Sequence, residues 1–314
     1  YSRATAVTED MVILTGQATK LSNIGWGPGE ANIYALDSNS GREIWKASID
    51  RTFEMPVIDA TAAYFVEDGS RLQSRSIQDG SLNWVFEPGG HLNNFPLIKK
   101  GVIYFTSTIT REDYKAFEVH AIDKNGNLKW KADATPNLGE LAEKGFLWSG
   151  PSNLTLVDDF LVWNYGIRRE GLRGLQDHCI EAFDITKRKM TLDYCVGKGN
   201  KHVLIVSDGK DVYIGYDNTI LIYTADNGKL KVSQPINLPR ELISDLLLTN
   251  NVLFVGTERD ILAIERKDPN VIHRVDYVET PFKNLSFSKG SLYMTTESLS
   301  PHAGIVVKYS PPSK

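Results

Sequence analysis

Histidines, clustered carboxylates and serines are the residues whose types and spacing in this sequence can support metal or hydrolytic chemistry. Asp208-Gly-Lys-Asp211 and Asp226-Asn-Gly228 resemble parts of calcium loops, but further oxygen ligands and a terminal Glu are missing. No serine lies in a nucleophile-elbow motif. We therefore interpret both Asp segments as hairpin turns and predict no catalytic residue, no metal and no cofactor. None of the histidines has a partner at the spacing of a metal site: His91, His120, His178, His202, His273 and His302.

The two cysteines, Cys179 and Cys195, flank a turn around Lys187. If this hairpin is symmetric about Lys187, the cysteines lie opposite one another on antiparallel strands, close enough for a disulfide. A disulfide predicts an oxidising compartment. The alternative is two unrelated buried thiols.

The elements that position these residues repeat along the chain. Each clear copy has a short strand, a polar turn with a glycine that tolerates positive φ, and a final strand with a tryptophan. A large ring at this place can bridge neighbouring units. The repeated positions are Asp37, Gly41 and Trp45 in the first copy, Gly80 and Trp84 in the second, and Asp123, Gly126 and Trp130 in the third.

The repeat predicts an all-β fold. Seven units in 314 residues give about 45 residues each, the length of a four-stranded propeller blade. We predict a seven-bladed β-propeller of four-stranded antiparallel blades, with eight blades as the alternative. No linker interrupts the repeat, so residues 1–314 are expected to form a single propeller domain. The second strands are expected at 11–15, 63–66, 102–106, 160–164, 212–216, 252–256 and 291–295.

Both ends of the chain affect the count of strands. The last unit, which ends near Ser310, lacks an outermost strand in the sequence, and residues 1–7 are expected to form the first strand of unit one. We therefore expect further sequence upstream of Tyr1.

Composition narrows the range of partners. The net charge is −4, and charges of both signs are mixed along the chain. This pattern does not indicate binding to nucleic acid or to an anionic membrane. The apolar runs are too short for a membrane span.

The pattern Ala35-Leu-Asp37-x-x-x-Gly41-x-x-x-Trp45 resembles the tryptophan-docking repeat of the pyrroloquinoline-quinone (PQQ) repeat family. That family contains quinoprotein dehydrogenases, which bind PQQ and calcium, and non-enzymatic members such as BamB, a periplasmic lipoprotein of the outer-membrane β-barrel assembly machine. The dehydrogenases carry a disulfide between adjacent cysteines, whereas Cys179 and Cys195 are sixteen residues apart. The resemblance therefore implies the non-enzymatic branch and a periplasmic location, and the protein can be held at the membrane by a lipid anchor in upstream sequence. The secretory lumen is the alternative location.

Connection lengths single out one face of the predicted propeller. Turns between first and second strands and between third and fourth strands are short, whereas the long loops belong to the other face. Long ordered loops on one side of a rigid scaffold usually mark the binding side. These long loops are 17–31, 107–115, 134–150, 166–177 and 297–303.

The long loops contain aromatic and arginine side chains, which are enriched in binding hot spots. In the alternative interpretation, the tryptophans pack within their own units and the arginines form a solvated surface. The candidate protein-binding residues are Trp26, Trp148, Arg168, Arg169 and Arg173.

We therefore predict a non-catalytic, extracytoplasmic scaffold, similar to BamB, that binds another protein through this face. The partner can itself be membrane-associated. Two alternatives are an enzyme or small-ligand binder at the central channel, and the lumenal sensor domain of a membrane protein.

Overall fold

The computed structural model describes most of the chain, and every regular element in the described part is a strand. The described residues are 2–7, 10–22, 25–50, 56–92, 94–110, 115–136, 145–147, 152–169, 176–198, 203–233, 235–238, 242–257, 260–277, 282–288, 291–296 and 305–309.

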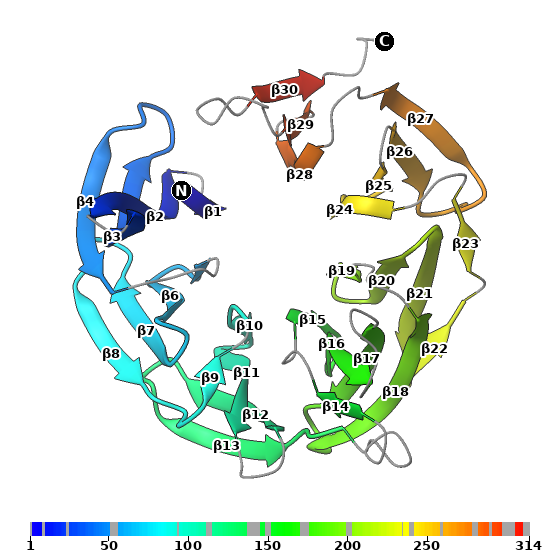
Figure 1. The fold of residues 1–314 in the computed structure, drawn as a ribbon, viewed down its shortest axis with the longest axis horizontal. Coiled ribbons are helices and arrows are strands. Elements are labelled where there is room, and N and C mark those ends of the chain that lie inside the picture. The colour runs from blue at the N-terminus through cyan, green and yellow to red at the C-terminus, as the bar shows by residue number, and fades with distance from the viewer. Residues whose placement is uncertain are drawn as a thin grey trace. The chain divides into compact units, whose positions relative to one another are not determined.

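The described strands form seven antiparallel sheets, and the main strands of each sheet follow one another in chain order (Figure 1). An all-β fold of four-stranded antiparallel units is therefore confirmed. The seven-blade count and the single domain stay predictions. The first three sheets contain β1 (Ser2–Val7), β2 (Met11–Ser22), β3 (Gly25–Asp37) and β4 (Glu43–Ile49); β5 (Val57–Ile58), β6 (Ala62–Glu67), β7 (Arg71–Ser76) and β8 (Leu82–Phe86); and β9 (His91–Leu92), β10 (Leu97–Lys99), β11 (Val102–Thr110), β12 (Lys115–Asp123) and β13 (Leu128–Asp133).

The remaining sheets repeat this order, and the last has three strands within the described residues. They contain β14 (Gly145–Leu147), β15 (Ser152–Val157), β16 (Phe160–Arg169), β17 (Gln176–Asp184) and β18 (Lys189–Lys198); β19 (Leu204–Ser207), β20 (Asp211–Tyr216), β21 (Thr219–Asp226), β22 (Lys229–Val232) and β23 (Ile236–Asn237); β24 (Leu242–Leu248), β25 (Val252–Thr257), β26 (Asp260–Glu265) and β27 (Ile272–Tyr277); and β28 (Phe282–Ser288), β29 (Ser291–Thr296) and β30 (Ile305–Tyr309). Three sheets carry one further short strand outside that order: β9 pairs with β11, β15 pairs with β16 beside β14, and β23 pairs with β21. The expected second strands correspond to β2, β6, β11, β16, β20, β25 and β29.

Contacts divide the chain into two compact units. The first comprises Tyr1–Leu154, Tyr165–Glu170 and Lys187–Met190, and the second comprises Thr155–Asn164, Gly171–Thr186 and Thr191–Lys314.

Apolar side chains join neighbouring sheets inside each unit. In the first unit, Ile33 of β3 and Phe65 of β6 share one core, and Leu72 of β7 and Phe105 of β11 share the next. Every position of β6 is buried, because a second strand lies between two other strands and packs on both faces. The outermost strand β4 instead mixes buried and exposed positions. The sequence therefore shows continuous apolar runs in second strands and mixed patterns in fourth strands.

The long segments predicted as loops are in large part strands, and this expectation was wrong for the described residues. The ladder between β2 and β3 continues to Ser22 opposite Gly25, and that between β11 and β12 continues to Thr110 opposite Lys115. Likewise β16 continues to Arg169 and β17 begins at Gln176. Pairing satisfies backbone amides and carbonyls that a loop would leave to solvent. Segment 134–150 contains the short strand β14, and segment 297–303 lies outside the described residues.

Candidate functional site

The candidate site is built on the ends of the sheets where the second strand turns into the third, which we call the hairpin ends. At the opposite ends the chain makes short turns, as between Asp37 and Gly41, where the Asp37 carboxylate accepts a hydrogen bond of 2.7 Å from the Ser40 amide. Strand β2 has 12 residues, whereas β6 has 6, so the β2–β3 hairpin extends well past its neighbour. The hairpin ends therefore present more variable surface than the short turns do.

A network of charged side chains fixes the hairpin end of the second sheet. Buried Glu67 accepts a hydrogen bond of 2.8 Å from the backbone amide of Asp50, which follows β4, and also one from Gln73. Arg71 contacts both Asp50 and Glu67. The hydrogen bond to Asp50, and then the charge of Glu67, raise the pKa of Arg71. These contacts tie the link between two sheets to the start of β7 and make this end rigid.

A polar hollow of about 560 Å³ adjoins this network. Its lining includes Asp68, Arg71, Glu87 and His91. The His91 ring packs on Gly69, where an added Cβ would lie 2.3 Å from His91 Cε1. The hollow offers donors and acceptors of both charges, which suits polar groups of a ligand or partner. Among the described residues no group of three or more His, Cys, Asp or Glu side chains is arranged to hold a metal ion.

The structure describes the backbone of three of the five predicted binding residues. Trp26 lies on β3 opposite Leu21 of β2, towards the tip of the long hairpin. Arg168 and Arg169 were predicted to lie on one loop with Arg173. This was wrong for the two described arginines, because the chain from Phe160 continues as strand β16 through Arg169. They are the last residues of β16, and Arg168 is paired with Phe146 of β14. Trp148 and Arg173 lie outside the described residues.

The opposite ends of the sheets are closed by ion pairs. In the first unit, Asp59, which follows β5, accepts hydrogen bonds from Tyr64 and Thr61, and its Oδ2 lies 2.8 Å from Lys124 Nζ. Burial favours the protonated carboxyl, but the hydrogen bonds from Lys124 and Thr61 outweigh it and hold the pKa of Asp59 well below its usual range. Lys124 belongs to the third sheet, so the pair joins two sheets.

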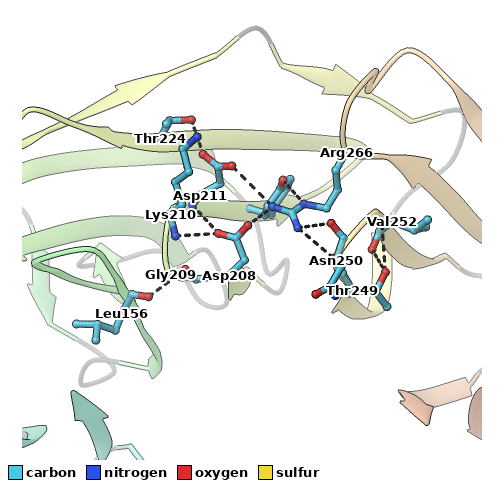
Figure 2. Close-up of polar contacts among 12 residues, drawn as sticks. Leu156, Asp208, Gly209, Lys210, Asp211, Thr224, Thr249, Asn250, Val252 and Arg266 are labelled. Atoms are coloured by element: carbon cyan, nitrogen blue, oxygen red, sulfur yellow. Dashed lines mark hydrogen bonds and ion pairs between the residues drawn. The ribbon is translucent and has the colours of Figure 1, made fainter. Parts of the chain in front are cut away.

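The second unit repeats this arrangement with Arg266, as Figure 2 shows. The guanidinium contacts the carboxylate of Asp208 and donates to the carbonyls of Asn250 (2.8 Å) and Thr249 (3.1 Å). Its Nε donates to the hydroxyl of Tyr213 at 3.0 Å. Burial works against the charge of Arg266, yet its pKa is raised because Tyr213 and Asp208 stabilise the cation.

The two ion pairs follow one sequence pattern that the sequence analysis missed. Each aspartate precedes a tyrosine of the second strand by five positions, and each cation directly follows the third strand of the next sheet. The aspartates belong to Asp59-x-x-x-x-Tyr64 and Asp208-x-x-x-x-Tyr213, and this spacing was the available signal. The pattern makes the short-turn ends a rigid base for the hairpin ends.

Tryptophans join the sheets at the same ends. Trp45 Nε1 donates to the Ile77 carbonyl at 2.9 Å, and its ring covers Gly80 of the next sheet. Trp84 Nε1 donates to the Lys124 carbonyl at 2.7 Å. Because each ring occupies the space of a missing Cβ, the glycine of the next turn is required for packing as well as for its positive φ.

His120 is buried at 1% exposure in the third sheet. Its Nε2 lies 2.9 Å from Ser107 Oγ, and its ring stacks on Phe105 with centroids 5.0 Å apart. Burial lowers its pKa to about 4, although the charge of Glu118 acts in the other direction. A neutral, fully buried imidazole of this kind packs and hydrogen-bonds, but it is not accessible to a substrate.

The predicted disulfide is confirmed. Cys179 and Cys195 join β17 to β18 across the turn that contains Lys187, with Cα atoms 3.9 Å apart. Within the part of the chain that is described, no helix has the length and hydropathy needed to cross a membrane.

Seven successive antiparallel sheets of the described residues, the first three of them joined by docked tryptophans, define a β-propeller repeat fold. Residues 29–171 match the family model PQQ_2, described as outer membrane protein assembly factor BamB, so this part of the chain is similar to PQQ-like repeat proteins. No curated protein sequence matches the chain.

Solved structures agree with this fold at low sequence identity. BamB from Moraxella catarrhalis matches with a TM-score of 0.54 and 13% identity, over 91% of this chain and 79% of that chain. The computationally designed Ika8 protein matches with a TM-score of 0.51 and 12% identity, over 93% and 92%. Quinohemoprotein alcohol dehydrogenase from Comamonas testosteroni matches with a TM-score of 0.56 and 10% identity, over 93% and 63%. At these identities the structural matches show the fold alone.

Proposed function

We propose that this protein is a non-catalytic, extracytoplasmic scaffold that binds a partner protein through the hairpin ends of its sheets. The observation that carries the proposal is the contrast between the two ends. One end has short turns tied together by Asp59–Lys124, Asp208–Arg266 and docked tryptophans, whereas the other has hairpins of unequal length. Variable connections on a rigid base are the usual arrangement of a binding surface.

The family match supports a scaffold role. The matched family is named for an outer-membrane assembly factor, and its model covers β4 to β16 and part of β3. The quinohemoprotein dehydrogenase shares the fold, but the described residues show no cluster of metal-ligating side chains that would favour an enzyme. A protein partner therefore remains the better-supported ligand class.

The disulfide supports a location outside the cytoplasm. Structural disulfides persist in the periplasm or in the secretory lumen, and Cys179–Cys195 closes a hairpin within one sheet. We propose the periplasm, because the matched family is named for outer-membrane assembly.

The test is a pull-down from native envelope extract with three proteins. The first is wild type, and the second carries Trp26→Ala, Arg168→Glu and Arg169→Glu at the hairpin ends. The control carries Lys100→Glu and Lys187→Glu, which lie in short turns at the opposite ends.

We expect one partner to be captured by wild type and by the control but lost from the hairpin-end variant, with melting temperatures unchanged. A partner that the hairpin-end variant retains would refute the assignment of the binding surface. Capture of no protein, together with binding of a small molecule, would favour the alternative of a small-ligand binder.

A further inference from the structure

The outermost strand of the second sheet, β8, differs from the other fourth strands in its charge. Fourth strands expose one edge, and proteins commonly protect such edges with lysine or other charged residues. In the described sheets β4, β13, β18, β22 and β27 all contain charged residues, whereas β8 reads Leu-Asn-Trp-Val-Phe and contains none. Figure 1 shows β8 as the last strand of its sheet, and no described strand pairs with its outer edge.

The same strand exposes more apolar surface than the others. Leu82 is 50% exposed and Val85 is 42% exposed, and β8 is the one described strand with two exposed large apolar side chains. A bulge at Asn83 interrupts the ladder to β7, but equivalent bulges occur where β4 and β13 pair. The bulge therefore does not protect β8 more than its neighbours.

A groove of about 840 Å³ lies over one face of this sheet, from β6 and β7 to β8. Its lining combines the aromatic rings of Tyr64 and Trp84 with the polar side chains of Ser74, Gln78 and Asn83. Lys124 also lines the groove, but its charge is paired with Asp59. The edge of β8 offers backbone groups to an extended polypeptide, and the amides, hydroxyls and rings of the groove suit those of its side chains that reach this face.

We propose that β8 is a second docking surface, which binds an extended segment of a partner protein by strand addition. The charges at its ends define the segment. Asp79 precedes β8 and Glu87 follows it, so a neutral apolar edge lies between two carboxylates. The complementary segment has apolar residues at alternate positions and a basic residue at each end. A second copy of this chain would instead bring like charges from both β8 strands to the same edge, which disfavours self-pairing.

The probe is a synthetic, fluorescently labelled peptide of alternating valine and threonine with an arginine at each end. We expect wild type to bind it in an anisotropy titration, and Val85→Lys to weaken binding about tenfold, because a buried lysine replaces an apolar contact. Val232→Lys is the matched control: Val232 is 57% exposed on β22, which already carries two lysines, and this change is expected to leave binding unaltered. Leu82→Lys is a second test variant, and equal melting temperatures would show that every variant is folded.

Two further measurements keep the proposal falsifiable. A peptide of the same sequence in which every backbone amide between the two arginines is N-methylated has no free edge that can pair with a strand, and we expect it not to bind. No binding of the unmodified peptide by wild type, or equal binding by Val85→Lys, would overturn the proposal. A concentration-dependent dimer of wild type that Val85→Lys dissociates, measured by light scattering, would also overturn it, since the edge would then serve a second copy. None of these results depends on the hairpin-end variants, so a result that refutes strand addition at β8 leaves the proposed function untouched, and the reverse also holds.

Discussion

Substitution of Gly80 by alanine tests how tryptophan docking holds neighbouring sheets together. Gly80 has φ of +72°, and a Cβ added there would lie 2.6 Å from Cε3 of Trp45. The left-handed conformation costs a non-glycine residue about 1 kcal/mol, and overpacking against a fixed ring costs about 1–3 kcal/mol. We therefore expect Gly80→Ala to reduce the free energy of unfolding by about 2–4 kcal/mol.

Gly41→Ala is the matched control for this prediction. Gly41 has nearly the same backbone conformation, with φ of +70°, but a Cβ added there has no atom within 4 Å. This variant should lose only the conformational part, about 1 kcal/mol. Urea unfolding followed by fluorescence measures both losses. Measured against Trp45→Leu alone, Gly80→Ala should cost only the conformational part, because the ring that the Cβ overpacks is then absent. Equal losses for Gly80→Ala and Gly41→Ala would refute the argument.

Three further predictions concern side chains away from the hairpin ends. Burial lowers the pKa of His120 to about 4, so between pH 6.5 and 4 the unfolded state binds more protons than the folded state. The free energy of unfolding should therefore fall by about 3 kcal/mol as the pH drops through that window. The urea midpoint of His120→Gln should not show this fall. Arg266→Met removes the hydrogen bonds in Figure 2 and should cost about 2–3 kcal/mol, whereas exposed Lys267→Met should have no measurable effect on thermal unfolding. Replacing Cys179 and Cys195 by alanine opens a loop of sequence separation 16 and should cost about 3 kcal/mol in the same assay, with no further loss when a reductant is added.

The strands and the disulfide were predictable because their signals are local. A residue pattern such as Val102–Thr106 shows a buried strand by its own composition, and a hairpin symmetric about Lys187 places Cys179 opposite Cys195. The positive φ of Gly41 likewise follows from its place in a polar turn.

The hairpin ends were less predictable, because polar and glycine-rich segments have weak strand signals. Residues 17–31 were expected to form a loop, yet pairing between β2 and β3 continues through most of them. The Asp208–Arg266 contact was missed for another reason: its residues are 58 positions apart and meet only when two sheets pack. The available signal was the spacing of five positions that Asp208 and Tyr213 share with Asp59 and Tyr64.

Site-specific photo-crosslinking tests the central claim most directly. A photoreactive residue replaces either Thr110, which is exposed at the hairpin end of β11, or Lys187, which is exposed in a turn at the opposite end of another sheet. Irradiation in native envelope extract should link a partner protein to the Thr110 position and not to the Lys187 position. Crosslinking from Lys187 alone, or equal crosslinking from both positions, would contradict a binding surface at the hairpin ends.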